Sequence, residues 1–357
     1  MTSHERVDTV VIGGGQTGLA VGQQLATQAR NFIVLDAHAD TGRTWRDRWD
    51  SLRLFTPAGF SHLPGLRFPA PARSFPTKDQ TADYLQAYAA RFAVPIRHNT
   101  RVEHLGPAAD GDGYIVTAGS RAWRAENVVI ATGAHNTPHI PAFSTELDPA
   151  ITQFAAQDYR RASQLPPGPV LVIGAGNSGA EIALDLLQHH RPVWLAGRDV
   201  GHIPALGNPL YRVMRAITVD TWPGRQLIPR AQASGGDPLG RVTRQHLRHA
   251  NLQRVPKITG ARQGLPALPD GRLLEPTTVI WATGYRPNYT WIDLPITDHR
   301  GQPTHHRGIT RQPGIYFAGL PFQSSLASHL IGGVGADAFN LIAHLTHSQR
   351  HQVDTGL

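Results

Sequence analysis

Two short glycine-rich stretches contain the residues of this sequence whose types and spacing best suit chemistry. Each follows a run of aliphatic and β-branched residues, and these runs begin at Val10 and Val170. Glycines at this spacing allow backbone N–H groups at the start of a helix to bind the pyrophosphate of a dinucleotide. The residues expected around the two pyrophosphates are Gly13, Gly15, Gln16, Thr17 and Gly18 in the first stretch and Gly174, Gly176, Asn177, Ser178 and Gly179 in the second.

The two stretches differ at the position that is expected to contact the adenosine ribose. The same count from the first glycine leads to Asp36 in the first stretch and to Gly197 in the second, where Arg198 follows. A carboxylate accepts hydrogen bonds from ribose hydroxyls, whereas a glycine leaves room for a 2′-phosphate that a guanidinium can bind through two hydrogen bonds. The first stretch therefore predicts an FAD site and the second an NADPH site. The alternative for Arg198 is an ordinary surface arginine.

Two further glycine corners are candidates for cofactor contact. Ala131-Thr132-Gly133 and Ala282-Thr283-Gly284 each end a probable strand, where a small corner lets the backbone approach a dinucleotide. A simple turn after a buried strand is the alternative for each. Gly319 follows the last probable strand, and Gly332 lies in a glycine-rich entry to the final helix, whose N-terminus would stabilise negative charge on a reduced flavin.

The elements that must position these residues repeat in order. A strand, a glycine loop, a helix and a second strand are expected over 9–35 and again from 170 to 196. Residues 41–76 suit loops, 81–92 suit an amphipathic helix, and 201–240 show no clear period. Further strands are expected at 114–117, 127–130, 278–282 and 314–318.

This order predicts an α/β fold with two dinucleotide-binding, Rossmann-like domains. The FAD domain is expected to be discontinuous, with the NADP domain inserted into it, and a Pro- and Gly-rich segment at 165–169 suggests a linker at the boundary. The expected ranges are 1–164 for the first part of the FAD domain, 165–284 for the NADP domain and 285–357 for the C-terminal part of the FAD domain.

The composition excludes several classes of protein. The sequence has 357 residues and no cysteine, so it cannot form disulfides, thiolate metal sites or a dithiol relay. The net charge of +8 is scattered, which suits anionic dinucleotides and does not favour nucleic acid. The 19 histidines lack zinc-site spacing, and no metal is expected. Without a signal peptide or a long apolar stretch, we expect a cytoplasmic monomer or homodimer that does not bind membranes.

The chain resembles the class B flavin-dependent monooxygenases, which include the flavin-containing and Baeyer–Villiger monooxygenases, in a compact bacterial form. Gly42-Arg43-Thr44-Trp45 resembles the Gly-Gly-x-Trp motif of this family, and 49–57 and 75–78 are similar to segments of the plant auxin-synthesis monooxygenases. The resemblance covers nearly the whole chain and implies that Thr44 and Trp45 lie at the cofactor. It also implies that NADPH reduces FAD and that a flavin C4a-(hydro)peroxide transfers one oxygen atom from O2 to a small amine, sulfide or ketone.

One signature of that family is changed here. Its Phe-x-Gly-x-x-x-His-x-x-x-(Trp or Tyr) motif aligns with 149–159, where Tyr159 keeps the terminal aromatic, Ala155 replaces the histidine and Ile151 replaces the glycine. The histidine is thought to organise the interdomain linker and NADP, and alanine cannot form the hydrogen bond. An FAD-dependent NAD(P)H oxidase or a quinone or small-molecule reductase is therefore an alternative. Two intact phosphate loops argue against a third possibility, a non-enzymatic redox or nucleotide sensor.

No protein residue is predicted to perform bond chemistry, because the flavin carries it. Aromatic and polar loop residues are the candidates to line a substrate pocket, and ordinary packing is the alternative for each of them. They are Trp45, Phe55, Thr56, Phe60, Phe322, Gln323 and Ser324.

Overall fold

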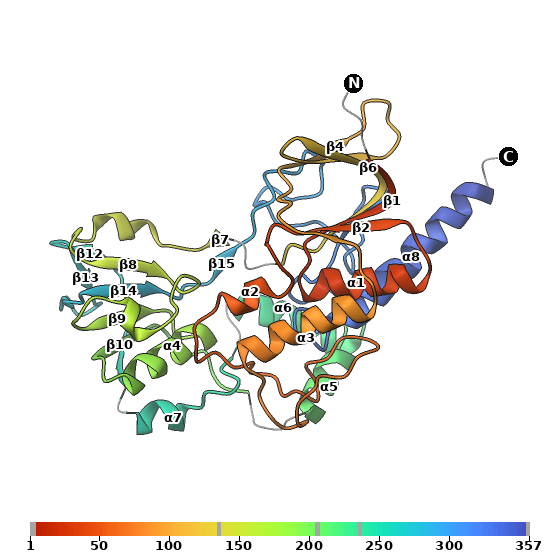
Figure 1. The fold of residues 1–357 in the computed structure, drawn as a ribbon. Coiled ribbons are helices and arrows are strands. Elements are labelled where there is room, and N and C mark those ends of the chain that lie inside the picture. Colours follow the sequence, from red (N-terminus) through yellow and green to blue (C-terminus); the bar gives the residue numbers. More distant parts are fainter. Residues whose placement is uncertain (1–4, 134–136, 204–207, 235–237, 251, 355–357) are drawn as a thin grey trace.

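The computed structural model describes residues 5–133, 137–203, 208–234, 238–250 and 252–354, which form two α/β units side by side (Figure 1). The sheet of the first unit has the order β3-β2-β1-β6-β5-β4, and β16 also pairs with β6. Its strands are β1 (Glu5–Ile12), β2 (Phe32–Leu35), β3 (Ile96–Arg97), β4 (His104–Pro107), β5 (Tyr114–Ala118), β6 (Arg121–Ile130) and β16 (Ile315–Phe317).

The parallel half of this sheet forms the nucleotide-binding part of the first unit. β1 pairs in parallel with β2 and β6, β6 pairs in parallel with β16, and β4 to β6 form an antiparallel extension. The helix α1 (Gln16–Thr27) packs against α3 (Lys78–Arg91) and α8 (Val334–Asp354). Aliphatic and aromatic residues from all three helices are buried in one core, among them Leu19, Tyr84 and Leu341. Burial of this apolar surface is the main force that fixes the helices on the sheet.

The second unit is a parallel sheet with the order β11-β10-β9-β14-β8. Its strands are β8 (Thr152–Ala155), β9 (Val170–Ile173), β10 (Val193–Ala196), β11 (Gln253–Val255) and β14 (Thr278–Trp281). The helix α4 (Asn177–Gln188) follows β9 and packs against β9 and β10. The predicted α/β fold with two dinucleotide-binding units is confirmed, and most expected strands lie within a few residues of their predicted positions.

The chain crosses between the units through the short antiparallel pair β7 (Thr137–Pro138) and β15 (Tyr285–Arg286). Because β8 precedes residue 165 and pairs with β14, strand pairing favours a second unit that begins at β8. The ranges 1–164, 165–284 and 285–357 themselves stay a prediction. The remaining elements are α2 (Arg43–Arg46), the 3-10 helices η1 (Ala142–Glu146) and η2 (Ala162–Gln164), α5 (Asn208–Ala216), α6 (Trp222–Ser234), α7 (Arg244–His249), β12 (Gly260–Arg262) and β13 (Leu265–Ala267).

Candidate cofactor and substrate site

The first glycine loop is closed tightly against the end of β6. Gly13 has φ +105°, and a Cβ there would lie 2.6 Å from the carbonyl oxygen of Ala131. A Cβ at Gly18 would lie 1.8 Å from the carbonyl oxygen of Gly13, so only glycine fits at this turn of α1. At Gly15, in contrast, a Cβ would meet no described atom within 4 Å. The loop is therefore closely packed on the side of Gly13 and Gly18 and open at Gly15, just before the start of α1. A site for a pyrophosphate requires this arrangement.

Asp36 lies at the end of β2 beside this loop. Its Oδ2 accepts a hydrogen bond from the backbone N–H of Gly14 at 2.5 Å, and its Oδ1 accepts one from the backbone N–H of His38 at 2.7 Å. The His38 ring Nδ1 lies 3.0 Å from the same Oδ1. Burial alone would raise the pKa of Asp36, but the hydrogen bonds from His38 and Gly14 outweigh it and lower the pKa. Asp36 is therefore ionised and able to accept hydrogen bonds from ribose hydroxyls.

The second glycine loop repeats this geometry. Gly174 has φ +112°, and a Cβ there would lie 2.1 Å from the carbonyl oxygen of Ala282, while a Cβ at Gly179 would lie 1.8 Å from that of Gly174. A Cβ at Gly176 would meet no described atom within 4 Å. The loop thus presents an equivalent open cradle at the start of α4.

The structure also brings each Ala-Thr-Gly corner to the loop with which the sequence associates it. Ala131 contacts Gly13 and Ala282 contacts Gly174 through their carbonyl groups. Gly133 and Gly284 both have positive φ, and a Cβ at either would meet no described atom within 4 Å. The corners therefore leave space next to both cradles.

Arg198 follows the left-handed corner at the end of β10. Gly197 has φ +139°, and a Cβ there would lie 3.0 Å from the backbone nitrogen of Ala175. Arg198 itself is exposed. The Arg254 guanidinium donates a hydrogen bond to the Gly197 carbonyl at 3.0 Å, so a second guanidinium lies beside this corner. The surroundings of Arg198 are therefore basic and open to solvent, which suits a phosphate.

Phe55 and Phe60 lie in an aromatic cluster that joins distant parts of the chain. The ring of Phe60 stacks on that of Tyr211 with centroids 5.1 Å apart, and both pack with Ala327 and Leu330. The Tyr211 hydroxyl donates to the carbonyl oxygen of Phe55 at 3.1 Å. Tyr211 carries no sequence signal of its own, because it belongs to α5, in the region without clear periodicity.

Three polar candidates for the substrate pocket, Thr56, Gln323 and Ser324, form hydrogen bonds with other groups of the protein. The Thr56 hydroxyl lies 2.7 Å from the Ser61 hydroxyl, and both are buried. The Gln323 side chain accepts from the Leu320 N–H at 3.2 Å, and the Ser324 hydroxyl donates to Asp337. These contacts satisfy the three side chains within the protein, so they support the loops and are weaker candidates for substrate contact.

The loop after β16 meets the start of α1 and of α8. The Phe322 ring packs edge-on against the His329 ring at 5.7 Å, and the Gln16 amide donates to the His329 carbonyl at 3.2 Å. A Cβ at Gly319 would lie 2.4 Å from Thr17 Oγ1, and a Cβ at Gly332 would lie 1.9 Å from the carbonyl oxygen of Phe60. Gly319 and Phe322 are thus brought to the first cradle from the other end of the chain, while Gly332 packs on the backbone of Phe60.

Asp337 in the first turn of α8 was not among the sequence candidates. It is 2% exposed, and its Oδ1 accepts a hydrogen bond from Ser324, whereas its Oδ2 has no partner among the described residues. Burial raises the pKa of this carboxyl. The signal available in the sequence was an acidic residue in a helical first turn, which is too common to single out.

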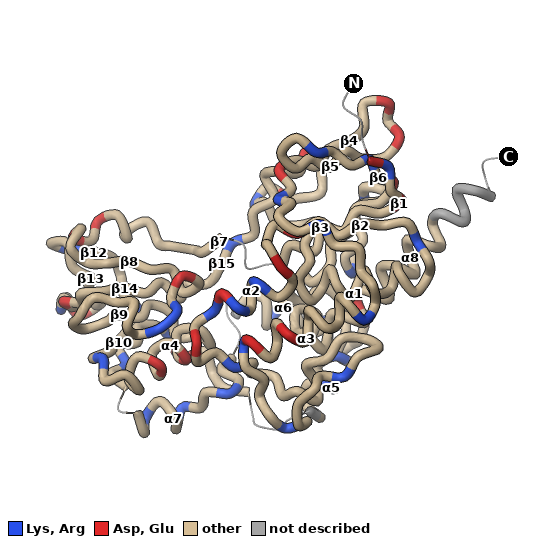
Figure 2. The backbone as a smooth tube through the Cα atoms, viewed as in Figure 1, with Lys and Arg blue, Asp and Glu red and all other residues tan. Residues whose placement is uncertain are grey.

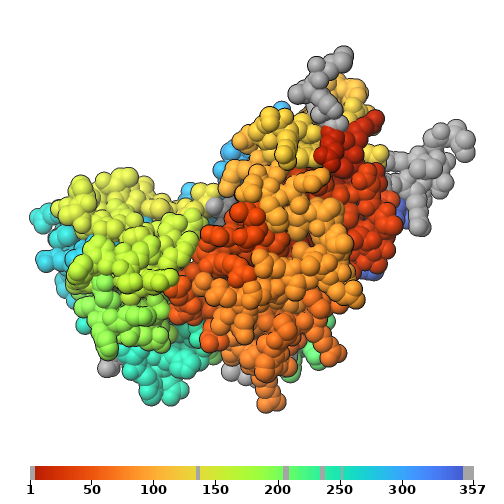
Figure 3. All heavy atoms as spheres, in the orientation of Figure 1, coloured from red at the N-terminus to blue at the C-terminus, as the bar shows by residue number. Residues whose placement is uncertain are grey.

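The segment around α2 connects the two units. Gly42, at the start of α2, has φ +85°, and Trp45 packs against the cores of both units, while Thr44 is exposed. Trp49 is buried in the core of the second unit although it lies in the first part of the chain. In the space-filling view this red-orange segment lies between the green second unit and the rest of the first (Figure 3).

The altered signature at 149–159 packs on the second unit, and the linker that follows it also contacts the first unit. Ala155 is buried at the end of β8, and the N–H of Ala156 donates to the Trp281 carbonyl at 2.9 Å. The buried Tyr159 hydroxyl donates to Asp185 Oδ2 of α4 at 2.5 Å. Two residues later in the linker, the Arg161 guanidinium lies 2.9 Å from the carboxylate of Asp50 in the first unit. The linker is thus fixed by contacts other than the missing histidine.

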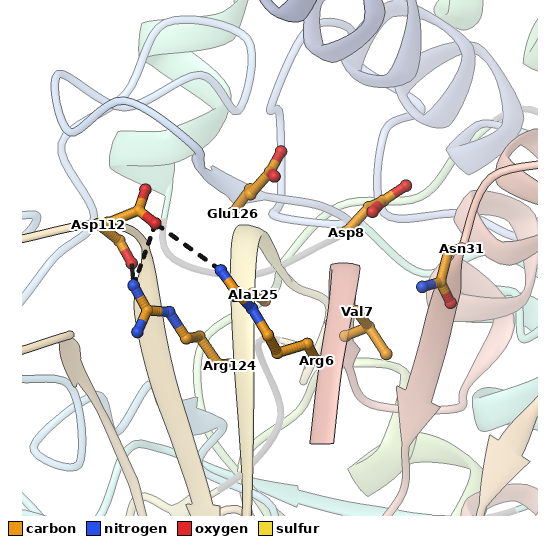
Figure 4. Close-up of a pocket in the computed structure, with 8 residues that line it drawn as sticks. All are labelled: Arg6, Val7, Asp8, Asn31, Asp112, Arg124, Ala125 and Glu126. Carbon is orange, nitrogen blue, oxygen red and sulfur yellow. Dashed lines mark hydrogen bonds and ion pairs between the residues drawn. The ribbon is translucent and has the colours of Figure 1, made fainter. Parts of the chain in front are cut away.

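A separate hollow lies near the amino end of β1 (Figure 4), whereas the first glycine loop follows the carboxyl end of that strand. It is lined by charged residues, of which Asp112 lies 3.1 Å from Arg124 and 3.9 Å from Arg6. Because these pairs are exposed and lie away from both cradles, we do not assign the hollow to the cofactors.

Charges elsewhere are distributed over the chain rather than gathered in one block (Figure 2). No described helix could cross a membrane, and the described residues contain no group of three or more potential metal ligands.

Two equivalent open cradles, one beside the ionised Asp36 and one beside a basic corner, have the geometry of a two-dinucleotide flavoprotein oxidoreductase. Residues 10–218 match the pyridine nucleotide-disulphide oxidoreductase family. An uncharacterized CzcO-like oxidoreductase of Geobacillus kaustophilus is 37% identical over 340 residues, which cover 94% of this chain and 97% of that protein. The chain therefore belongs to the pyridine nucleotide-disulphide oxidoreductase family, although without cysteine it cannot form a dithiol of its own.

Other relatives are flavin monooxygenases. The indole-3-pyruvate monooxygenase YUCCA1 of rice (Oryza sativa) is 28% identical, and the match covers 97% of this chain and 92% of that protein. The structure of a flavin-containing monooxygenase from Stenotrophomonas maltophilia superposes with a TM-score of 0.78 and 28% identity, covering 96% of this chain and 99% of that one. The resemblance to flavin monooxygenases and the prediction of an enzyme that uses FAD and NADP(H) are confirmed.

Proposed function

We propose that this protein is an NADPH- and O2-dependent flavoprotein monooxygenase that inserts one oxygen atom into a small organic substrate, with an amine, a sulfide or a ketone as the candidate classes. The observation that carries the proposal is the pair of matched cradles at Gly15 and Gly176, where a Cβ would meet no described atom within 4 Å. Their open space fits two dinucleotides. The named relatives add the oxygen chemistry, because several of them are monooxygenases.

In this proposal each group of residues has a limited task. Asp36 binds the ribose of FAD, the N–H groups at the start of α1 and α4 bind the two pyrophosphates, and Arg198 binds the 2′-phosphate of NADPH. When bound, the flavin supplies electron transfer from NADPH and the activation of oxygen. The protein then has to exclude water and hold the substrate, for which the partly exposed Phe55 and Phe322 offer apolar surface, while the buried Phe60 supports them from behind.

Stopped-flow mixing of the NADPH-reduced protein with oxygen tests this function. We expect a long-lived absorbing species between reduced and oxidised flavin, followed by product that contains one atom from labelled O2. Flavin that returns directly to the oxidised form, with all reducing equivalents recovered as hydrogen peroxide, would support the oxidase. A protein that contains FMN, or no flavin after reconstitution, would contradict the assignment of the first cradle.

One observation favours a second candidate, an FAD-dependent NAD(P)H oxidase. Ala155 lies at the end of β8 where the family signature has histidine, so the side chain here cannot donate a hydrogen bond to NADP. The oxidase would release peroxide whatever substrate is supplied. The monooxygenase would release less peroxide when a good substrate is added, and that comparison separates the two.

A further inference from the structure

Residues 238–241, which we call the strap, are bound directly to the start of α4. The Asn177 side chain donates through Nδ2 to the Pro238 carbonyl at 3.1 Å and accepts through Oδ1 from the Gly240 N–H at 2.9 Å. Asn177 is the first residue of α4, and its own backbone belongs to the second cradle. Its amide side chain is therefore occupied by the strap, while its N–H remains available to a pyrophosphate.

A second contact fixes the strap one turn further along α4. Arg241 Nη2 lies 3.3 Å from Glu181 Oε1, and the Glu181 side chain is only 5% exposed. Removing Arg241 would leave the buried Glu181 carboxyl without its charged partner, which is costly, so this contact holds the strap on α4. Asn177 and Glu181 are spaced so that both lie on one face of the helix.

The strap also reaches the other end of the second nucleotide site. The Leu239 N–H donates a hydrogen bond to the Gly201 carbonyl at 3.1 Å. The Leu239 carbonyl accepts one from the Ile203 N–H at 2.8 Å. The Gly201 N–H in turn donates to Asp199 Oδ1 at 2.9 Å, immediately after Arg198. The strap is thus connected both to the pyrophosphate end and to the ribose end of this site.

Its third neighbour belongs to the first unit. A Cβ at Gly240 would lie 2.8 Å from the Phe55 Cβ and 3.0 Å from its ring, so the glycine backbone packs directly on Phe55. Phe55 is linked by its carbonyl to Tyr211, which stacks on Phe60. A shift of the strap would therefore press on, or release, the aromatic candidates of the substrate pocket.

We propose that Asn177 and Glu181 are positioning residues, and that the strap couples NADP(H) binding to the placement of Phe55. The proposal rests on the assignment of the second cradle to NADP(H). Because coupling between two sites is reciprocal, a change at Phe55 must alter NADP(H) affinity if the strap transmits it. Closely packed contacts cannot absorb a small displacement of the backbone, so they transmit it from one site to the other.

A double-mutant cycle on the flavin-loaded protein tests the coupling. NADP+ affinity is titrated by flavin absorbance for the wild type, Phe55→Leu, Asn177→Ala and the double variant. We expect Phe55→Leu to change the NADP+ dissociation constant about fivefold and to have no further effect once Asn177 is alanine, because both residues act through the same partner, Gly240. Phe339→Leu is the control, because this exposed aromatic residue of α8 should leave NADP+ affinity unchanged.

The possible outcomes are distinct. Additive effects of Phe55→Leu and Asn177→Ala would overturn the strap while leaving the nucleotide assignment intact. Failure of the wild type to bind NADP+ would overturn the proposed function and, with it, this inference. If Asn177→Ala does not fold, Arg241→Met replaces it in the cycle, since it removes the ion pair with Glu181 and keeps much of the side-chain volume. The same loss of the Phe55 effect is expected there, and an additive result would again overturn the strap.

Discussion

Arg198 gives the most specific prediction at the scale of single residues. The substitution Arg198→Ala should raise the KM for NADPH about tenfold to a hundredfold and leave that for NADH nearly unchanged, since a charge-assisted hydrogen bond contributes about 1.5–3 kcal/mol and only NADPH carries the 2′-phosphate. Steady-state kinetics with both cofactors measures this, with the exposed Arg121→Ala of the first unit as the control. Equal losses for NADPH and NADH would indicate a structural role.

The opposite substitution, an acidic residue at position 197, is opposed by the backbone conformation, which the sequence does not reveal. An acid at position 197 would restore a ribose acceptor for NADH, but Gly197 has φ +139° and its Cβ would lie 3.0 Å from the Ala175 nitrogen. Side chains rarely adopt this conformation. We therefore expect Gly197→Asp to destabilise the second unit rather than to change its cofactor preference cleanly.

Glu181 predicts a pH dependence of stability. Burial raises its pKa from 4.5 to about 7, although Arg241 acts against the shift. A carboxyl whose pKa is raised by folding stabilises the native state fully below pH 4.5, and this contribution is lost as the pH rises to about 7. Urea unfolding of the wild type should show up to about 3 kcal/mol lost between pH 5 and pH 8.

Two variants decide whether Glu181 is the cause. Glu181→Gln cannot ionise, so its free energy of unfolding should be less dependent on pH over that interval. The exposed Glu146→Gln should keep the slope of the wild type. Identical slopes for the wild type and Glu181→Gln would show that the buried carboxylate is fully compensated by Arg241.

At the scale of elements, the linker between β8 and β9 decides how firmly the units are held together. Tyr159→Phe leaves the buried Asp185 without its hydroxyl donor and so should loosen α4 from the linker. We expect severalfold more hydrogen peroxide per NADPH consumed, measured with a peroxidase-coupled assay. Tyr289→Phe is the matched control, because that tyrosine is also buried but forms no hydroxyl hydrogen bond within the described residues. Unchanged peroxide yield in Tyr159→Phe would assign the coupling to other contacts.

The elements also show where sequence reasoning succeeds and where it ends. β1, β9 and the loops after them were predictable, because aliphatic runs and glycine spacing are local signals. α6 was not, because Pro223, Gly224 and Pro229 break its helical pattern. The contact between the strap and α4 was also not predictable, because Asn177 and Gly240 are far apart in the sequence and no local pattern indicates that they meet.

At the scale of the whole molecule, the two cradles should be separable by one matched pair of substitutions. Gly15 and Gly176 both lie at helix N-caps with extended backbone, φ −76° and −73°, and a Cβ at either would meet no described atom within 4 Å. The protein therefore has room for a Cβ at both positions, and the branched side chain of valine would extend into the space that a pyrophosphate needs. Both variants should fold, as thermal unfolding and circular dichroism would show.

Their cofactor losses should differ. Gly15→Val should purify without FAD and be inactive, whereas Gly176→Val should keep FAD and its visible spectrum but lose reduction by NADPH. Dithionite should still reduce the flavin of Gly176→Val, because that reaction does not need the second cradle. If Gly176→Val also lost FAD while remaining folded, the two sites would not be independent. If Gly15→Val kept FAD, the first glycine loop would not be the pyrophosphate site of FAD. The assignment of FAD to the first unit and of NADP(H) to the second would then have to be reversed.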